Sequence, residues 1–282
     1  MKNILWKPKN VEKTKMMQFL DQINTSYSLD IKSYEDLHRW SIENISDFWK
    51  EIWNASDIVH SKSYNEIVDD VHKMPGAKWF QGSRINFAEN LLRFKDDRVA
   101  IHFQSENFTE QKITYRELYD KVSSLSQSLK SIGVEKGDRV VGYLPNIPET
   151  VVAMLATTSL GAIWSSCSPD FGINGTLDRF KQIEPKVVFA ADGYIYNGKN
   201  FDSLEKLEKI LCKLPSVNKV VIIDYICKNP KQIIIPNSVR YDDFLSDASK
   251  PIEFEQLPFH HPVYIMYSSG TTGTPKSIVH SA

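Results

Sequence analysis

Apolar strand-like segments alternate with helical segments from about residue 96 onward, and this alternation limits the possible folds more than any other feature of the chain. Two of the strand-like segments are RVVGYL at 139–144 and KVVFA at 186–190, which are apolar enough to be buried on both faces. Parallel neighbours in a sheet need a long crossover, which a helix usually supplies, so the alternation predicts βαβ units. The expected fold class is therefore α/β with a largely parallel sheet.

The boundaries of these segments follow from local signals. Thr114 and Glu117 have the spacing of a capping box and should start one helix, which Gly133 should end. Residues 227–259 contain four prolines and are expected to be irregular. The expected strands are 98–104, 112–114, 139–144, 162–167, 186–190, 219–224 and 263–267, and the further helices are 148–160, 175–183 and 203–214.

The first 95 residues differ in character from the rest of the chain. Five of the six tryptophans lie within the first 80 residues. Ser33 and Ser46 are expected to cap two helices there, and residues 48–53 form an apolar stripe typical of a core or docking face. We therefore predict a helical, aromatic-rich cap region at residues 1–95 and the α/β part of the chain at residues 96–282.

Charge and composition exclude several classes of function. The 282 residues carry a formal net charge of −1, which argues against a nucleic-acid partner. No apolar run approaches the roughly 20 residues of a membrane span, and the N-terminus lacks the apolar segment of a secretory signal, so we expect no membrane partner. Cys167, Cys212 and Cys227 form no C-x-x-C pair. These features predict free thiols and a cytoplasmic location.

The residues that follow the expected strand at 263–267 are the best candidates for a binding site. Glycines allow backbone N–H groups to converge on phosphate oxygens, hydroxyls add donors, and a lysine supplies a mobile positive charge. The Walker template G-x-x-x-x-G-K-[ST] fits Gly270 and Lys276, but Pro275 occupies the place of the second glycine and has no N–H to offer. The predicted phosphate-binding residues are Ser268, Ser269, Gly270, Thr271, Thr272, Gly273, Thr274, Pro275 and Lys276.

This loop resembles the signature loop of the adenylate-forming superfamily, which includes acyl-CoA synthetases, luciferases and peptide-synthetase adenylation domains. One departure is Ser277, which stands where the superfamily usually has glycine. The motifs around the loop resemble the acetoacetyl-CoA synthetase branch, whose usual small residue at that position is alanine. Further segments similar to that branch lie along the whole chain, at 5–8, 37–41, 48–49, 79–92, 167–172, 177–180 and 183–186.

The resemblance implies a fold, a reaction and site residues. The chain would be the incomplete N-terminal domain of an adenylate-forming enzyme, ending just after the phosphate loop and preceded by the cap region of acetyl- and acetoacetyl-CoA synthetases. In the family, acetoacetate attacks the α-phosphate of ATP, pyrophosphate leaves, and the thiol of coenzyme A then displaces AMP. Lys276 and Thr271 would be the catalytic residues, and Arg179 is a weaker candidate for a contact to coenzyme A.

Two consequences concern what the chain would lack. Such enzymes are roughly twice as long, so we expect an N-terminal fragment that is inactive by itself. The Mg²⁺ ligands and most of the acyl pocket would lie downstream, and we expect no metal ligands within the chain. ATP, Mg²⁺ and coenzyme A are thus the expected cofactors and co-substrates.

Alternatives remain open at this point. The same chemistry could serve acetate, propionate or another short acid, because the acyl pocket would lie mostly beyond residue 282. A chain that only binds ATP, without catalysis, is an alternative from another class.

Overall fold

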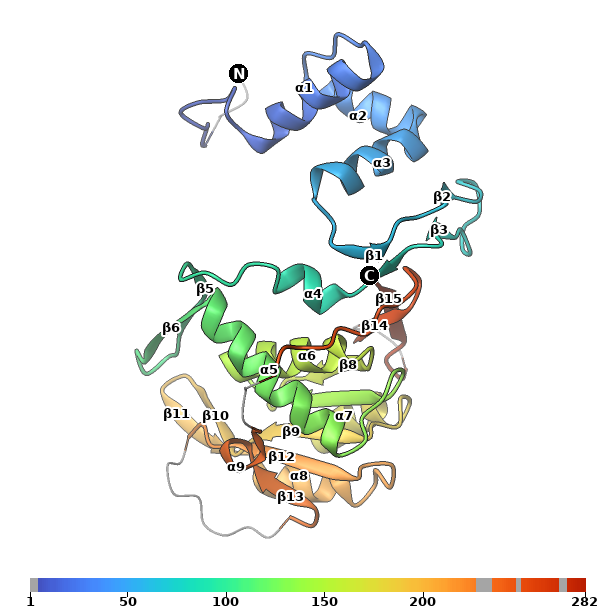
Figure 1. The fold of residues 1–282 in the computed structure, drawn as a ribbon. Helices are drawn as coiled ribbons and strands as arrows, with labels where there is room; N and C mark the ends of the chain where they lie inside the picture. The colour runs from blue at the N-terminus through green and yellow to red at the C-terminus, as the bar shows by residue number, and fades with distance from the viewer. Residues whose placement is uncertain (1–4, 227–234, 247–249, 269–272) are drawn as a thin grey trace. The chain divides into compact units, whose positions relative to one another are not determined.

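The computed structural model of the chain describes residues 5–226, 235–246, 250–268 and 273–282 (Figure 1). The chain divides into two compact units, the first made of residues 1–58 and 64–82 and the second of residues 59–63 and 83–282. Among the described residues, none of the helices has the length and apolar character needed to span a membrane.

The first unit is built around aromatic side chains. Trp53 packs against Tyr64 and Phe80, with ring centroids 5.2 and 4.8 Å away, and Trp49 meets Trp79 edge to face at 5.8 Å. The expected aromatic stripe is therefore at least partly core. The elements of this unit are α1 (Lys15–Tyr27), α2 (Tyr34–Glu43), α3 (Ile45–Ala55), and the antiparallel pair β2 (Glu66–Val68) and β3 (Trp79–Gln81).

The helix starts in this unit test two of the sequence predictions. Ser33 caps α2, because its hydroxyl accepts the Asp36 N–H at 3.1 Å. The prediction that Ser46 caps the next helix is wrong, since α3 begins at Ile45 and Asn44 is its N-cap. Asn44 also ends α2, and its side-chain amide donates to the carbonyl of Trp40 at 3.1 Å. One residue thus serves both helices, and Ser46 lies inside the first turn of α3.

The second unit contains a seven-stranded sheet with the order β13-β12-β9-β7-β8-β14-β15. All neighbouring strands in it run parallel except β14 and β15, which form an antiparallel pair at one edge. The expectation of an α/β fold with a largely parallel sheet is confirmed. The strands are β7 (Arg139–Tyr143), β8 (Ile163–Cys167), β9 (Val187–Ala191), β12 (Lys219–Ile223), β13 (Ser238–Arg240), β14 (Pro262–Tyr267) and β15 (Ser277–Ser281).

The remaining elements of this unit are short pairs of strands and the helices. The antiparallel pairs are β1 (His60–Lys62) with β4 (Arg84–Ile85), β5 (Val99–Gln104) with β6 (Glu110–Thr114), and β10 (Gly193–Tyr196) with β11 (Lys199–Asp202). The helices are α4 (Phe87–Leu91), α5 (Tyr115–Ser131), α6 (Pro148–Ser159), α7 (Ile173–Phe180), α8 (Leu204–Leu211) and α9 (Tyr241–Phe244).

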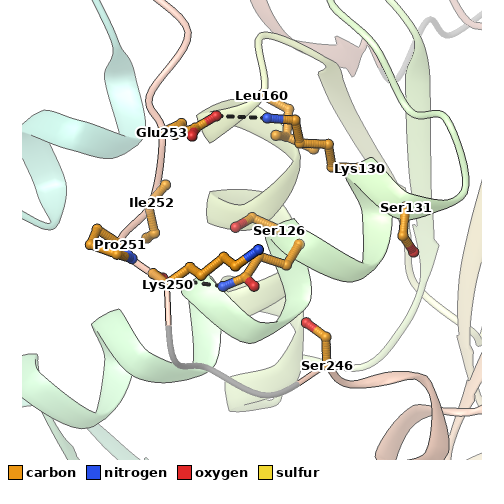
Figure 2. Close-up of a pocket in the computed structure, with 10 residues that line it drawn as sticks. Ser126, Lys130, Ser131, Leu160, Ser246, Lys250, Pro251, Ile252 and Glu253 are labelled. Atoms are coloured by element: carbon orange, nitrogen blue, oxygen red, sulfur yellow. Dashed lines mark hydrogen bonds and ion pairs between the residues drawn. The ribbon is translucent and has the colours of Figure 1, made fainter.

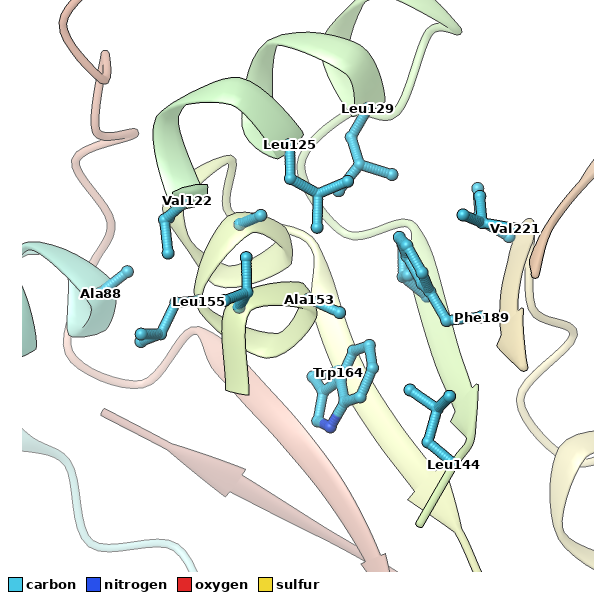
Figure 3. Packing of buried hydrophobic residues seen from close by; sticks show 14 of the residues in the cluster. Ala88, Val122, Leu125, Leu129, Leu144, Ala153, Leu155, Trp164, Phe189 and Val221 are labelled. Atoms are coloured by element: carbon cyan, nitrogen blue, oxygen red, sulfur yellow. The ribbon is translucent and has the colours of Figure 1, made fainter. Parts of the chain in front are cut away.

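The central strands of the sheet are buried on both faces, and successive side chains of each strand point to opposite sides. Val140 packs with the helices α5 and α6, whereas Val141 packs with α7 and α8. Phe189 and Trp164 lie on the α5–α6 side, with ring centroids 6.4 Å apart (Figure 3). Two cores of apolar side chains thus hold the sheet between two helical layers, which explains the apolar runs in the sequence.

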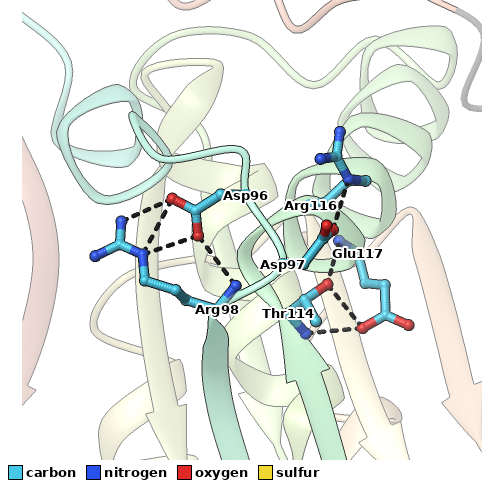
Figure 4. Close-up of polar contacts among 6 residues, drawn as sticks. All are labelled: Asp96, Asp97, Arg98, Thr114, Arg116 and Glu117. Carbon is cyan, nitrogen blue, oxygen red and sulfur yellow. Dashed lines mark hydrogen bonds and ion pairs between the residues drawn. The ribbon is translucent and has the colours of Figure 1, made fainter.

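The capping box predicted at the start of α5 is present (Figure 4). The Thr114 hydroxyl accepts the Glu117 N–H at 3.2 Å, and the Glu117 carboxylate accepts the Thr114 N–H at 2.7 Å. Gly133 follows the helix with φ +78°, a left-handed conformation that glycine adopts without strain. The local signals at both ends of this helix therefore act as the sequence indicated.

The structure adds strands that the sequence analysis missed. The stretch expected to be irregular contributes β13, which extends the sheet by pairing with β12. The residues after the 268–276 loop form β15, so the loop joins the two strands of a hairpin. β13 has only three residues, which is too short for an alternating pattern to be recognised. β15 has five residues, but polar and apolar side chains do not alternate along it.

Candidate functional site

A cleft of about 620 Å³ lies at the carboxyl halves of the neighbouring strands β8 and β14. In parallel α/β sheets, ligands bind outside the carboxyl ends of the strands, because the loops that follow them meet there. The cleft is therefore in the position expected of a ligand site. Its lining combines serines, aromatic rings and one arginine, and consists of Phe87, Met154, Trp164, Ser165, Ser166, Cys167, Ser168, Phe171, Arg179, Tyr264, Ile265, Met266 and Tyr267.

The predicted phosphate-binding loop connects β14 to β15 and begins directly after Tyr267, a residue of the cleft. Its base is closed by the Ser268 N–H, which donates to the carbonyl of Lys276 at 3.1 Å. Gly273 has φ +93°, where a larger residue would be strained. Of the predicted loop residues, Ser269, Gly270, Thr271 and Thr272 lie outside the described residues.

Lys276 is exposed beside this closed base. Within the described parts of the chain, no carboxylate lies in ion-pair range of its ammonium group, although nine other ion pairs are found there. A lysine with an uncommitted charge at the end of a glycine- and hydroxyl-rich loop can pair with an anion.

Arg179 lines the cleft from α7 and not from either strand. Its guanidinium carbon lies 4.6 Å from the ring centroid of Phe171 and 5.6 Å from that of Tyr267. One guanidinium nitrogen donates to the carbonyl of Gly175 at 2.6 Å. The side chain is thus held against the cleft wall while most of its donors remain available.

The titratable groups at the floor of the cleft are kept neutral. Burial raises the pKa of the Cys167 thiol to about 12, with a smaller opposing effect of the Arg179 charge. Burial also raises the pKa of the Tyr267 hydroxyl to about 12, and Ser165 is its hydrogen-bond partner at 3.2 Å. Neither group is therefore a base or nucleophile near neutral pH, so Arg179 is the only one of the described lining residues that carries charge.

The loop after β8, which forms one wall of the cleft, is anchored from below by Tyr143. This side chain is completely buried, and its hydroxyl donates to the carbonyls of Pro169 at 2.8 Å and Phe171 at 3.2 Å. Because these bonds hold the backbone on both sides of Asp170, they position Phe171 beneath the guanidinium of Arg179.

A second cavity, of about 420 Å³, lies between α5 and residues 250–253 (Figure 2). Several of its polar groups are paired with one another. Lys130 pairs with Glu253 at 2.7 Å, and the Gln127 amide donates to the carbonyl of Lys250 at 3.1 Å. We assign no chemistry to this cavity.

The described residues contain no group of three or more His, Cys, Asp and Glu side chains that could hold a metal ion. His260 and His261 are adjacent in the sequence and belong to no such group of described residues. A ring nitrogen of His261 lies 2.8 Å from the carbonyl oxygen of Gly161. His280, on β15, packs its ring on Tyr264 at 5.4 Å.

Comparison with known proteins places these features in a family. The model of the AMP-binding enzyme family matches residues 87–282, which include the sheet, the cleft and the loop. The chain belongs to the AMP-binding enzyme family. The model of the acetyl-coenzyme A synthetase N-terminus matches residues 34–91 in addition. The adenylate-forming resemblance noted in the sequence is thereby confirmed.

Several known proteins are similar to this chain over most of its length. An acetoacetyl-CoA synthetase of Macaca fascicularis is 49% identical over 99% of this chain and 43% of its own length. A malonamoyl-CoA synthetase of Penicillium aethiopicum is 39% identical over 99% of the chain and 40% of its own length. The solved structure of an acetoacetyl-CoA synthetase from Streptomyces lividans superposes with a TM-score of 0.89 at 37% identity, over 96% of the chain and 42% of that structure. The chain thus spans less than half the length of these relatives, as the resemblance led us to expect.

Sequence reasoning found the loop but missed much of its surroundings. The sequence analysis gives Trp164 and Tyr267 no role in a binding site, although their place in buried strands that lead to the loops of a parallel sheet is a usable signal. Gln182 carries no signal of a role in the sequence. Its amide donates to the carbonyl of Pro275 at 2.9 Å, a contact across 93 positions that no local pattern announces.

Proposed function

We propose that the protein carrying this chain is an ATP-dependent acid–thiol ligase that activates acetoacetate as an acyl-adenylate and transfers it to coenzyme A. The observation that carries the proposal is the loop of residues 268–276 with its exposed Lys276, placed at the carboxyl end of β14 beside the cleft. Membership of the AMP-binding enzyme family and the 49% identity to an acetoacetyl-CoA synthetase support it.

The proposed reaction assigns a role to the loop. When the carboxylate of the acid attacks the α-phosphate of ATP, negative charge grows on the departing pyrophosphate. Backbone N–H groups, hydroxyls and a lysine that are already in place around that charge lower the barrier, since they need no rearrangement. In this proposal Lys276 pairs with the β- and γ-phosphates, Thr271 is among the hydroxyl donors, and Pro275 stiffens the turn between them.

The cleft is the proposed route to the reacting phosphate for the other substrates. Arg179 would meet coenzyme A there, because its guanidinium is the one charged group among the described residues of the lining and its donors are mostly available. When bound, Mg²⁺ would neutralise charge on the phosphates of ATP; the described residues supply no ligand cluster for it.

The names of two relatives narrow the choice of the acid substrate. Acetoacetate and malonamate both carry a carbonyl on the carbon next to the acid's methylene group, and the synthetases similar to this chain are named for these two acids. We therefore place acetoacetate first and malonamate second, ahead of acetate and propionate.

Replacing Lys276 tests the proposal in the complete protein. We expect Lys276→Ala to slow acetoacetate-dependent ATP–pyrophosphate exchange by about 10- to 1000-fold, the scale of losing one preorganised charge contact. Lys130→Ala is the matched control, because it removes another exposed lysine, one that is committed to Glu253, and should leave the exchange rate unchanged. An exchange rate of Lys276→Ala equal to that of the wild type would refute the role of the loop.

A panel of acids tests the substrate. Exchange should be fastest with acetoacetate, and malonamate should be accepted better than acetate or propionate. A wild-type protein that prefers acetate would refute the assignment of acetoacetate as the substrate, but not the assignment of the reaction class.

A further inference from the structure

Ser277 is the position at which this chain departs from the usual glycine of the adenylate-forming loop, and the proposed reaction gives it no role. In the structure its hydroxyl donates to the Oε1 atom of Gln182 at 3.0 Å. Gln182 follows α7, and its Nε2 donates to the carbonyl of Pro275 at 2.9 Å. One glutamine side chain therefore holds the residues on both sides of Lys276.

The orientation of the Gln182 amide follows from its partners. Its nitrogen faces two carbonyl oxygens, that of Pro275 and that of Asp178 one helical turn earlier at 2.5 Å. Carbonyl oxygens can only accept, so the NH₂ group must point to them, and the amide oxygen is left for a donor. The Ser277 hydroxyl is that donor. Glycine or alanine at this position would leave the Gln182 oxygen without a partner on the loop.

These contacts complete a closed frame around the backbone of Lys276. On one side, the Lys276 carbonyl accepts the Ser268 N–H, and on the other, Ser277 pairs with Tyr267 at the first step of the β14–β15 ladder. Gln182 ties this frame to the end of α7, three residues after Arg179. The origin of the lysine side chain is thus fixed with respect to a helix that lines the cleft.

We propose that Gln182 is a positioning residue for the phosphate-binding lysine, acting through Pro275 and Ser277, and that Ser277 makes this clamp two-sided. The inference rests on the proposed function of the loop. A lysine whose backbone is held in place loses less freedom when it pairs with phosphate, so the clamp should act on ATP and not on the acid.

Kinetics of the complete protein test the clamp. We expect Gln182→Ala to lower kcat/KM for ATP in acid-dependent ATP–pyrophosphate exchange about tenfold, the scale of one or two hydrogen bonds, with KM for acetoacetate and the melting temperature unchanged. Ser277→Ala should cost about two- to threefold. In the Gln182→Ala background it should cost nothing more, because its partner is already absent.

Gln127→Ala is the matched control, since this glutamine also donates to a backbone carbonyl at an exposed site but contacts Lys250 and not the loop. Gln182 variants with wild-type kcat/KM for ATP, or equal losses for ATP and acetoacetate, would overturn the proposal.

Calorimetry with ATP alone separates this inference from the proposed function. If the wild type binds ATP but catalyses no exchange, the ligase assignment fails, and a roughly tenfold higher Kd of Gln182→Ala for ATP still supports the clamp. A wild-type protein that binds no ATP would overturn both.

Discussion

Replacing Asn86 with alanine should destabilise the second unit more than the loss of so small a side chain would suggest. The side chain is completely buried. Its Nδ2 group donates to the carbonyls of Thr158 at 3.2 Å, Ser159 at 3.1 Å and Glu255 at 2.9 Å, while its Oδ1 accepts the Glu89 N–H at 3.1 Å and caps α4. One amide thus joins the start of α4, the end of α6 and the segment that leads to β14.

The size of the effect follows from what each partner keeps. The Thr158 carbonyl still accepts the Gly161 N–H, and the Ser159 carbonyl still accepts the Glu255 N–H, so neither is left without a bond. The loss is then a helix cap, about 1 kcal/mol, and a partly buried Glu255 carbonyl without its amide donor, about 1–3 kcal/mol. We expect Asn86→Ala to lower the free energy of unfolding by about 3 kcal/mol.

Urea denaturation followed by circular dichroism measures this loss. Asn86→Asp dissects it, because the aspartate keeps an acceptor for the Glu89 N–H but turns a carboxylate toward three carbonyls. That environment raises the pKa of the introduced acid in the folded state, so the variant should be most stable at acid pH and lose stability as pH rises through that pKa. A loss below 1 kcal/mol for Asn86→Ala, or an aspartate variant as stable as the wild type at pH 7, would refute the reasoning.

Two further predictions concern the helix start of α5 and the cleft thiol. Thr114→Ala should lower the free energy of unfolding by about 1 kcal/mol in the same assay. Hydrogen bonds from the backbone N–H and the hydroxyl of Thr114 hold the pKa of Glu117 below its usual range, so the wild type should lose stability as pH falls through that lowered pKa. The variant keeps the backbone N–H and should therefore lose less stability over the same pH range. At pH 8, native protein treated with a maleimide and analysed by mass spectrometry should be modified at exposed Cys212 and not at buried Cys167, whose pKa burial raises to about 12. That raised pKa also means that stability present below the ordinary thiol pKa is lost as pH rises toward 12. Equal labelling of the two thiols in the native state would contradict the burial argument.

Sequence reasoning succeeded where the determinants are local. The neighbouring valines 140 and 141 pack on opposite faces of the sheet, so the apolar run that contains them could only be a strand buried on both sides. The capping box of α5 spans four residues. In each case the residues that decide the structure lie beside one another in the chain.

Sequence reasoning failed where contacting residues are far apart in the chain or where one residue has two roles. Asn44 ends one helix and starts the next, and this double role displaced the predicted cap at Ser46. The contact of Gln182 with Pro275 bridges 93 positions. β13 pairs over three residues only, which is too short for a period of two to be distinguished from chance.

The order of the strands has a consequence for how the protein is made. β14 pairs with β8 through Tyr264 and Trp164, which are 100 positions apart. As the chain leaves the ribosome, β7, β8, β9 and β12 can assemble in turn, but the edge of β8 stays open until residues beyond 262 have emerged. An open strand edge is a template for pairing with other chains. Any truncation before β14 would therefore remove the proposed phosphate-binding loop and at the same time leave a strand edge open to pairing with other chains.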